Sequence, residues 1–162
     1  MRLWFRYKGK ELGLLSTSYS FKSVAGAFTD PDAGTFPFQG QQGLKQITIN
    51  NTTERTAHDT ASDGTIMVSY ISGASGSAEI EVQQNSSLHQ FLVNWANIKY
   101  TQAEGGGGAS NFASAALKVI DLINGAIHTL TGISPAKIPD KNYTAAGGMV
   151  TWRLMAANVV TQ

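Results

Sequence analysis

The chain has 162 residues, no cysteine and a formal net charge of +1. The missing thiols exclude a disulfide framework, a thiolate zinc site and a cysteine nucleophile. Only 14% of the residues are charged, against about 25% in an ordinary soluble domain. A weakly charged surface near neutrality favours association between copies, and a dedicated nucleic-acid binder would carry a basic excess that this chain lacks.

The first 18 residues differ from the rest in composition. They hold four of the twelve basic residues, together with Trp4, Phe5 and Tyr7. We expect residues 1–18 to form an N-terminal arm or extension, with a frayed terminus as the alternative, and residues 19–162 to form a single domain. We expect no targeting segment and no membrane span, because no apolar run has the length that either requires.

From Tyr19 onward the pattern is mainly that of β-strands. Alternating apolar and polar residues, bounded by turn signals, predict strands that face a core on one side. Asn124-Gly125 is typical of a tight hairpin turn. Gly34–Gly43 and Asp140–Gly148 are expected to be loops. The predicted strands are Tyr19–Thr29, Lys45–Thr53, Thr65–Ser72, Ser77–Gln84, Asn111–Ile123, Ala126–Ile138 and Met149–Val160.

One helix is predicted, over Ser87–Tyr100. Ser87 and Gln90 have the spacing of a capping box, and an apolar stripe with helical spacing follows. His89 is expected on the opposite, exposed side, and Gly105–Gly108 ends the helix. The predicted core anchors are Leu88, Phe91, Leu92, Trp95 and Trp152.

These elements indicate a mainly β fold with one helix. About seven strands joined by short turns predict an antiparallel sandwich or barrel with the helix against it.

The polar side chains do not predict an enzyme. His58, Asp59 and Asp63 lie in the polar segment Glu54–Gly64, but a metal site needs three or four convergent ligands. We therefore interpret this segment as a solvated or interface loop. Glu79 and Glu81 share one strand face, which is more typical of a solvated surface than of an acid–base pair. No catalytic residue, metal or cofactor is expected.

Several short strings of residues are informative when they are taken together and in order. They are Tyr19–Val24, His58–Asp59, Asp63–Ser69, Glu81–Gln84, Ser87–Trp95, Thr131–Pro135 and Val150–Ala157. In this order and spacing they resemble tail tube proteins of contractile-tailed bacteriophages. The resemblance extends from about Tyr19 to Asn158 and does not include residues 1–18 or the glycine run at 105–108.

The resemblance implies a structural virion protein of the phage tail tube fold, which is shared with type VI secretion tubes. In this fold two antiparallel sheets form a barrel-like sandwich with one flanking α-helix. Hexameric rings would stack into a tube whose lumen conducts double-stranded DNA during ejection. The implied partners are other copies of the chain, a sheath protein, and baseplate and tail terminator proteins. The protein would be located in the tail of the virion, after assembly in the cytoplasm of the host bacterium.

Two sets of residues are candidates for roles in such a tube. The long polar segment has no evident purpose within one chain, so it is expected to reach an adjacent ring or subunit. Few basic residues in the lumen would let DNA slide, because each Lys or Arg that pairs with a phosphate adds a sequence-independent attraction. The inter-subunit candidates are Glu54, Arg55, His58, Asp59 and Asp63, and the lumen-facing candidates are Glu79 and Glu81.

Two other functions fit the sequence. A tube of a contractile injection system such as a tailocin, with no genome to pass, would have the same protomer. A monomeric β-sandwich that binds carbohydrate would expose aromatic residues, for which Tyr70, Tyr100 and Tyr143 are available.

Overall fold

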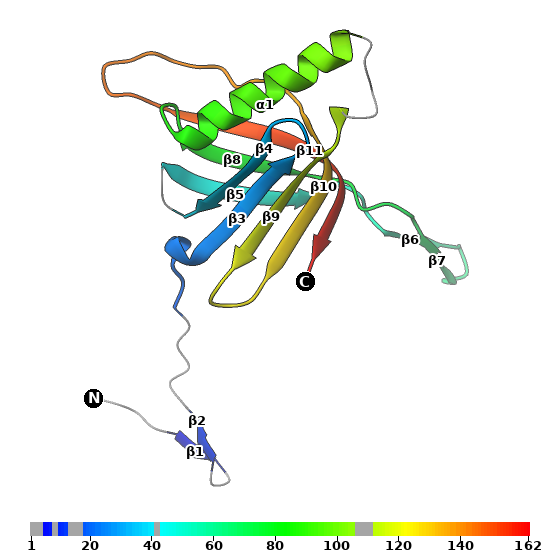
Figure 1. Cartoon of the computed structure of the whole chain (residues 1–162). Coiled ribbons are helices and arrows are strands. Elements are labelled where there is room, and N and C mark those ends of the chain that lie inside the picture. The colour runs from blue at the N-terminus through cyan, green and yellow to red at the C-terminus, as the bar shows by residue number, and fades with distance from the viewer. Residues whose placement is uncertain (1–4, 8–9, 13–17, 41–42, 106–111) are drawn as a thin grey trace.

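The computed structural model describes residues 5–7, 10–12, 18–40, 43–105 and 112–162. Its elements follow one another along the chain as drawn in Figure 1. They are β1 (Phe5–Tyr7), β2 (Lys10–Leu12), a 3-10 turn η1 (Phe21–Ser23), β3 (Val24–Asp30), β4 (Gly34–Gln39), β5 (Leu44–Asn51), β6 (Thr56–Thr60), β7 (Ile66–Tyr70), β8 (Gly76–Gln83), α1 (Ser87–Glu104), β9 (Ala115–Asp121), β10 (Ile127–Pro135) and β11 (Met149–Thr161).

The main structural unit is one seven-stranded sheet with the strand order β4-β3-β9-β10-β11-β8-β5. Every neighbouring pair in it is antiparallel. The sheet curls, and α1 lies on its flank (Figure 1). β11 is an interior strand, between β10 and β8. The predicted mainly β class with one flanking helix is confirmed, and the two layers of the predicted sandwich are the two halves of this single curled sheet.

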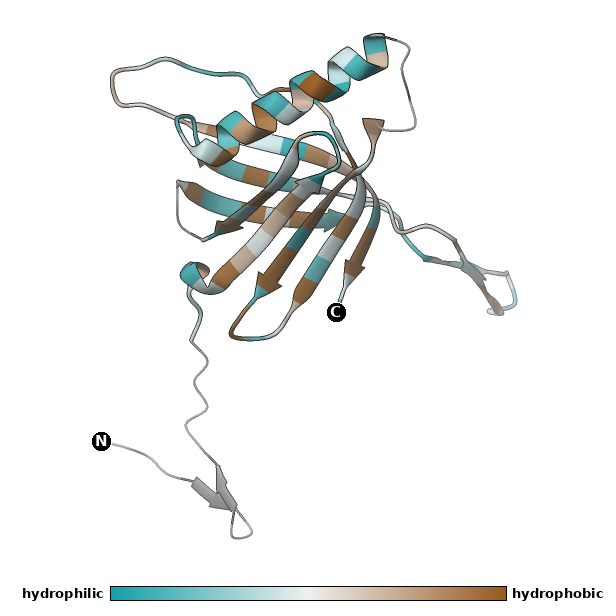
Figure 2. Cartoon of the chain, viewed as in Figure 1, coloured by the Kyte–Doolittle hydropathy of each residue, from teal (hydrophilic) through white to brown (hydrophobic). Residues whose placement is uncertain are grey.

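The core lies on the inner face of the curled sheet. Alternation along β8 and β11 brings apolar side chains inward at every second position, which Figure 2 shows as brown bands along the strands. Phe28 of β3 contacts Trp95 of α1 edge-on, with ring centroids 4.8 Å apart. Leu88, Leu92, Trp95 and Trp152 are buried in this core, and Phe91 is partly buried against it.

The helix begins at Ser87, as predicted, but its N-cap is one residue earlier than the predicted capping box, and it runs about one turn longer than predicted. Ser86, not Ser87, is the N-cap, and its Oγ accepts a hydrogen bond from the backbone N–H of His89 at 3.2 Å. The helix continues to Glu104 and ends at Gly105. Residues 106–108 of the predicted helix-ending glycine run lie outside the described residues.

Two segments predicted as loops are strands. Gly34–Gly43 contains β4, which pairs with β3 because Phe36 and Phe38 face the core side. Pro37 is tolerated there because β4 is an edge strand. Glu54–Gly64 contains β6, which pairs with β7 to form a hairpin of its own. Cross-strand pairing outweighs the low strand propensity of its polar residues.

His89 is buried, although its position in the helical pattern predicts an exposed side chain. It is 4% exposed, and its Nδ1 accepts a hydrogen bond from Nε1 of Trp152 at 3.0 Å. Burial is the main reason that the pKa of His89 lies below its ordinary value. The buried face of the helix is therefore wider than the stripe of four apolar residues that the sequence predicts.

Most of the predicted N-terminal arm lies outside the described residues. In the described part, β1 and β2 pair with each other as a two-stranded sheet, and the division into arm and domain stays a prediction. In the described part of the chain, no helix is long and apolar enough to span a membrane.

Candidate assembly surfaces

The hairpin formed by β6 and β7 projects away from the curled sheet (Figure 1). All residues of both strands are exposed. The register pairs Thr56 with Tyr70 and His58 with Val68. The side chains of Ile66, Val68 and Tyr70 therefore share one face, and they are 57%, 60% and 68% exposed. The sequence predicts this shared apolar face, but no described residue of the chain buries it.

Local hydrogen bonds shape the tip of the hairpin. The backbone N–H of Ala61 donates to the carbonyl of Thr65 at 2.8 Å, and Gly64 has a φ of +88°, which glycine adopts without strain. Asp63 Oδ1 accepts from the N–H of Thr65 at 2.9 Å. That hydrogen bond is the main cause that lowers the pKa of Asp63. Asp63 is therefore a turn residue at this tip.

The base of the hairpin is fixed by a side-chain pair. Arg55 Nη2 donates to Tyr70 Oη at 2.7 Å, and the guanidinium carbon lies 5.7 Å from the centroid of the Tyr70 ring. Thr53 Oγ1 and Ser75 Oγ are 2.6 Å apart at the junction with the main sheet. The first contact joins the two sides of the hairpin at its base, and the second joins the two segments that connect it to the main sheet.

The predicted inter-subunit residues do not converge on one point. His58 and Asp59 are consecutive strand residues, so their side chains lie on opposite faces of the hairpin. Asp63 lies at the tip and Arg55 at the base. The five residues are all exposed: Glu54, Arg55, His58, Asp59 and Asp63. Among the described residues, no three His, Asp or Glu side chains are grouped so that they could hold a metal ion.

Glu79 and Glu81 lie on the outer face of the curled sheet, away from the core. Both are half-buried on β8, between β11 on one side and β5 on the other. Lys45 Nζ lies 2.9 Å from Glu81 Oε1. Together with Gln46, Thr48 and Thr151, the two glutamates line a shallow polar depression of about 210 Å³.

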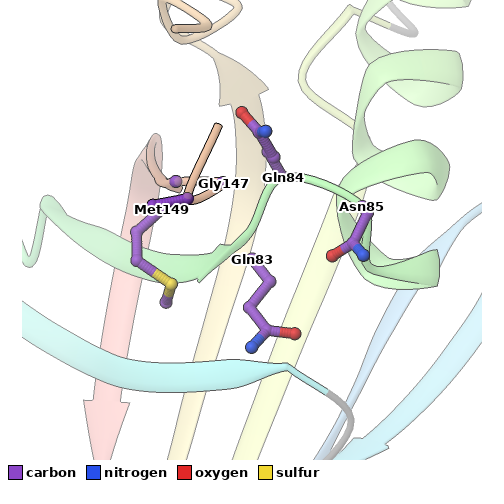
Figure 3. Close-up of a pocket in the computed structure, with 7 residues that line it drawn as sticks. Gln83, Gln84, Asn85, Gly147 and Met149 are labelled. Carbon is purple, nitrogen blue, oxygen red and sulfur yellow. The ribbon is translucent and has the colours of Figure 1, made fainter. Parts of the chain in front are cut away.

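A second polar depression, of about 400 Å³, lies where β8 leads into α1. Figure 3 shows Gln83, Gln84 and Asn85 on one side of it and Gly147 and Met149 on the other. The backbone N–H of Gln84 donates to the carbonyl of Gly148 at 3.1 Å. The described residues that line this depression offer amides and a thioether, so they supply neither a general acid nor a general base.

A buried ionic cluster that the sequence reasoning missed connects α1 to the sheet. The side chains of Lys99 and Asp30 are 0% exposed. Lys99 Nζ lies 2.9 Å from Asp30 Oδ1, 2.8 Å from Asp32 Oδ2 and 3.0 Å from Ser114 Oγ. Asp30 Oδ2 also accepts from the backbone N–H groups of Asp32 and Ala33 at 2.9 Å each.

The pKa values of this cluster follow from its contacts. Burial alone would raise the pKa of Asp30, but the hydrogen bonds from Lys99 and from two backbone N–H groups outweigh it and lower that pKa. Burial would lower the pKa of Lys99, and the hydrogen bonds to Asp32 and Asp30 raise it instead. The cluster is therefore ionised at neutral pH, and its contacts fasten the helix to the turn between β3 and β4.

Residues 16–161 match the model of a protein family described as "Bacteriophage PhiTE tail tube protein". The chain belongs to this family. The family match confirms the resemblance that the ordered strings indicated, and it identifies the chain as a structural tail tube protein. No curated protein is similar in sequence to the chain.

Solved structures of contractile injection systems share the fold. The chain superposes on the PVC sheath/tube terminator of an extracellular contractile injection system with a TM-score of 0.61 and 9% identity, covering 91% of this chain and 99% of that one. For a chain of the PVC sheath-tube complex the TM-score is 0.56 with 11% identity, and the match covers 91% of this chain and 93% of that chain. For the tube terminating cap of the anti-feeding prophage the TM-score is 0.53 with 11% identity, and the match covers 98% of this chain and 99% of that chain.

Proposed function

We propose that this chain is the protomer of a phage tail tube, which closes hexameric rings that stack into a tube. Double-stranded DNA passes through the lumen of that tube during ejection. The observation that carries the proposal is the family match over residues 16–161. In this function the protein is structural, without catalytic residues or a cofactor, and it is located in the tail after assembly in the host cytoplasm.

The β6–β7 hairpin supports assembly on physical grounds. An isolated two-stranded hairpin is only marginally stable in water, and its large apolar side chains are more than half exposed. A monomer with such a surface is prone to aggregate, whereas an assembly would bury it. We assign the inter-subunit contact to this hairpin, including Arg55 at its base.

The outer face of the sheet around Glu79 and Glu81 is our candidate for the lumen surface. Lys45 pairs with Glu81 and Arg153 lies opposite Glu79. The two carboxylates offset these basic side chains and limit their attraction for DNA phosphates, which lets DNA slide. Replacing both by lysine should leave tubes intact in the electron microscope and slow genome ejection, because phosphates would then pair with the wall. Replacing both by glutamine is the matched control with a smaller expected effect. Ejection at the original rate with lysine at both positions would refute the assignment.

A tube of an injection system without a genome is the second candidate. It is favoured by the fold neighbours, whose descriptions name an extracellular contractile injection system and a prophage cap. The sheath and terminator named for those proteins are the partners we propose for this chain, together with a baseplate. Neighbouring genes for a capsid and a packaging motor would decide for the phage.

A monomeric carbohydrate-binding module is less well supported. The three tyrosines available for sugar stacking come from three different elements: Tyr70 from β7, Tyr100 from α1 and Tyr143 from the segment between β10 and β11. Negative-stain electron microscopy with light scattering on one sample tests the assembly. Rings or hollow tubes with six-fold end views are expected. A monomer at high concentration that binds sugar saturably would favour the binding module.

A further inference from the structure

Among the described residues, the curled sheet is covered at one end and open at the other. Asp30, the last residue of β3, lies beside Lys99 of α1, so the helix covers that end. Val24, the first residue of β3, lines an apolar groove of about 320 Å³ at the opposite end. Figure 1 shows α1 far from η1 and the β9–β10 turn, which lie at the open end.

The groove leads directly into the core. Val24 and Val119 are 9% and 5% exposed and belong to the hydrophobic core, and Ile47 and Ile49 are partly buried against it. Tyr19, which is 70% exposed, lies at the rim of the groove. Such an opening leaves Tyr19, Ile47 and Ile49 in partial contact with water, which an apolar side chain from outside would displace.

We propose that this groove receives the Ile66–Val68–Tyr70 face of the β6–β7 hairpin of a second copy. The inference rests on the proposed function, since it names the surface to which the hairpin binds in the assembly. Alternate residues of a strand lie about 7 Å apart on one face. A groove of about 320 Å³ lies near the lower limit of ligand pockets, about 300 Å³. It accommodates side chains of that face rather than a folded segment.

One pair of charges is complementary between the two surfaces. The acidic residues of the hairpin lie away from its Ile66–Val68–Tyr70 face: Glu54 at the base, Asp59 on the opposite face and Asp63 at the tip. Asp121 lines the groove, and its carboxylate accepts from the backbone N–H of Ile123 at 3.0 Å. This hydrogen bond is the main cause that lowers the pKa of Asp121, so the groove carries a negative charge at neutral pH. On the hairpin, the guanidinium of Arg55 is held against Tyr70. Tyr70 therefore brings a positive charge with it toward Asp121.

The contact joins two different surfaces of the same chain and is therefore heterologous. After one hairpin has entered one groove, the pair still has a free groove and a free hairpin. Repetition of such a contact closes a ring or extends a filament. The exposed hairpin and the open groove thus complete each other in the assembly, although each is unfavourable in the monomer.

The test uses the absence of cysteine, which allows a probe to be attached at one position. Full-length chain with Val68→Cys is labelled with a benzophenone maleimide and mixed with ¹⁵N-labelled chain. The mixture is irradiated under conditions in which the unsubstituted chain forms rings or tubes. Ser69→Cys, on the opposite face of the same strand, carries the same label as the matched control.

Mass spectrometry of the cross-linked peptides gives the result. We expect the probe at position 68 to capture peptides around Tyr19–Val24 or Ile47–Ile49 of another copy, and the probe at position 69 not to do so. Rings or tubes in which position 68 captures other surfaces, or the segment 1–17, would overturn the inference and leave the proposed function standing. If the unsubstituted chain forms neither, both are overturned.

A pull-down with complementary variants provides a second readout. Val68→Asp places a charge on the apolar face of the hairpin and blocks its binding. Because Val68 is exposed, this change leaves the fold unaffected. Ala126→Arg fills the groove, whose lining includes Ala126. Tagged Val68→Asp should capture Ala126→Arg at least about tenfold better than either variant captures its own kind, since burial of an apolar side chain contributes on this scale. Equal capture in all combinations would contradict a heterologous contact.

Discussion

The buried lysine of the ionic cluster makes the sharpest prediction for the stability of the fold. In Lys99→Met a flexible apolar side chain of similar length replaces the ammonium group. The carboxylate of Asp30, whose side chain is 0% exposed, then loses its counter-charge. It keeps two backbone N–H donors, while Asp32, with a side chain 30% exposed, can turn to water.

The size of the destabilisation depends on the hydrogen bonds that still stabilise the Asp30 carboxylate. Removal of one partner of a buried ion pair costs about 3–5 kcal/mol, because it leaves an uncompensated charge. The two backbone donors place Lys99→Met at the lower end, at about 3 kcal/mol. For a domain of this size, each kcal/mol shifts the melting temperature by about 2–4 °C. We therefore expect the melting temperature to fall by about 6–12 °C.

The assay is equilibrium unfolding in urea, at protein concentrations where light scattering shows no assembly, because association would stabilise the folded state. Lys45→Met is the matched control, since Lys45 has a carboxylate at the same distance but its side chain is 60% exposed. An exposed pair contributes at most about 1 kcal/mol. The double variant Lys99→Met/Asp30→Asn should recover part of the loss because the unpaired charge is gone.

Two results would refute this reasoning. One is a loss of less than about 1 kcal/mol in Lys99→Met, which would mean that the cluster is hydrated in solution. The other is a double variant that is less stable than Lys99→Met, which would mean that the Asp30 carboxylate stabilises the fold without its partner.

Three further changes test local features. Burial lowers the pKa of His89 below 6.5, so the folded state has its full stability above pH 6.5 and loses stability as the pH falls below that value. In His89→Gln the amide oxygen can still accept from Trp152, and thermal melts of this variant should no longer show the loss at low pH. Gly26→Ala would place a Cβ 2.5 Å from the carbonyl oxygen of Lys118, and a loss of about 1–3 kcal/mol in urea unfolding is expected. Ser86→Ala removes the helix cap and should cost about 1 kcal/mol; an unchanged urea midpoint in either of these variants would contradict the geometry.

Where the sequence pattern had a single physical cause, it predicted the fold well. Alternation along β8 and β11 arises because one face of the sheet is buried, and the stripe from Leu88 to Trp95 arises because α1 packs on that face. The ionic cluster also left a signal. Lys99 follows Trp95 by four positions and so continues the buried stripe, and the Asp30-Pro31-Asp32 turn supplies its partners.

The hairpin shows why the remaining features could not be predicted. Alternation at Ile66, Val68 and Tyr70 predicts a strand with one apolar face, but it does not tell whether that face is buried within the chain or by another molecule. β4 has the glycine and proline content of a loop, and only its pairing with β3 makes it a strand. His89 looks polar in the helical pattern because its partner, Trp152, is 63 positions away.

The position of β11 between β10 and β8 affects the order in which the sheet can form. β8 and β10 both pair with β11, so the two halves of the sheet are joined only after this strand has been synthesised. Until then β8 and β10 each present an unpaired edge, and such long-range pairing is slow. A chain interrupted before β11 therefore lacks the closed core. The curled sheet becomes available for assembly only in chains that include their last strand.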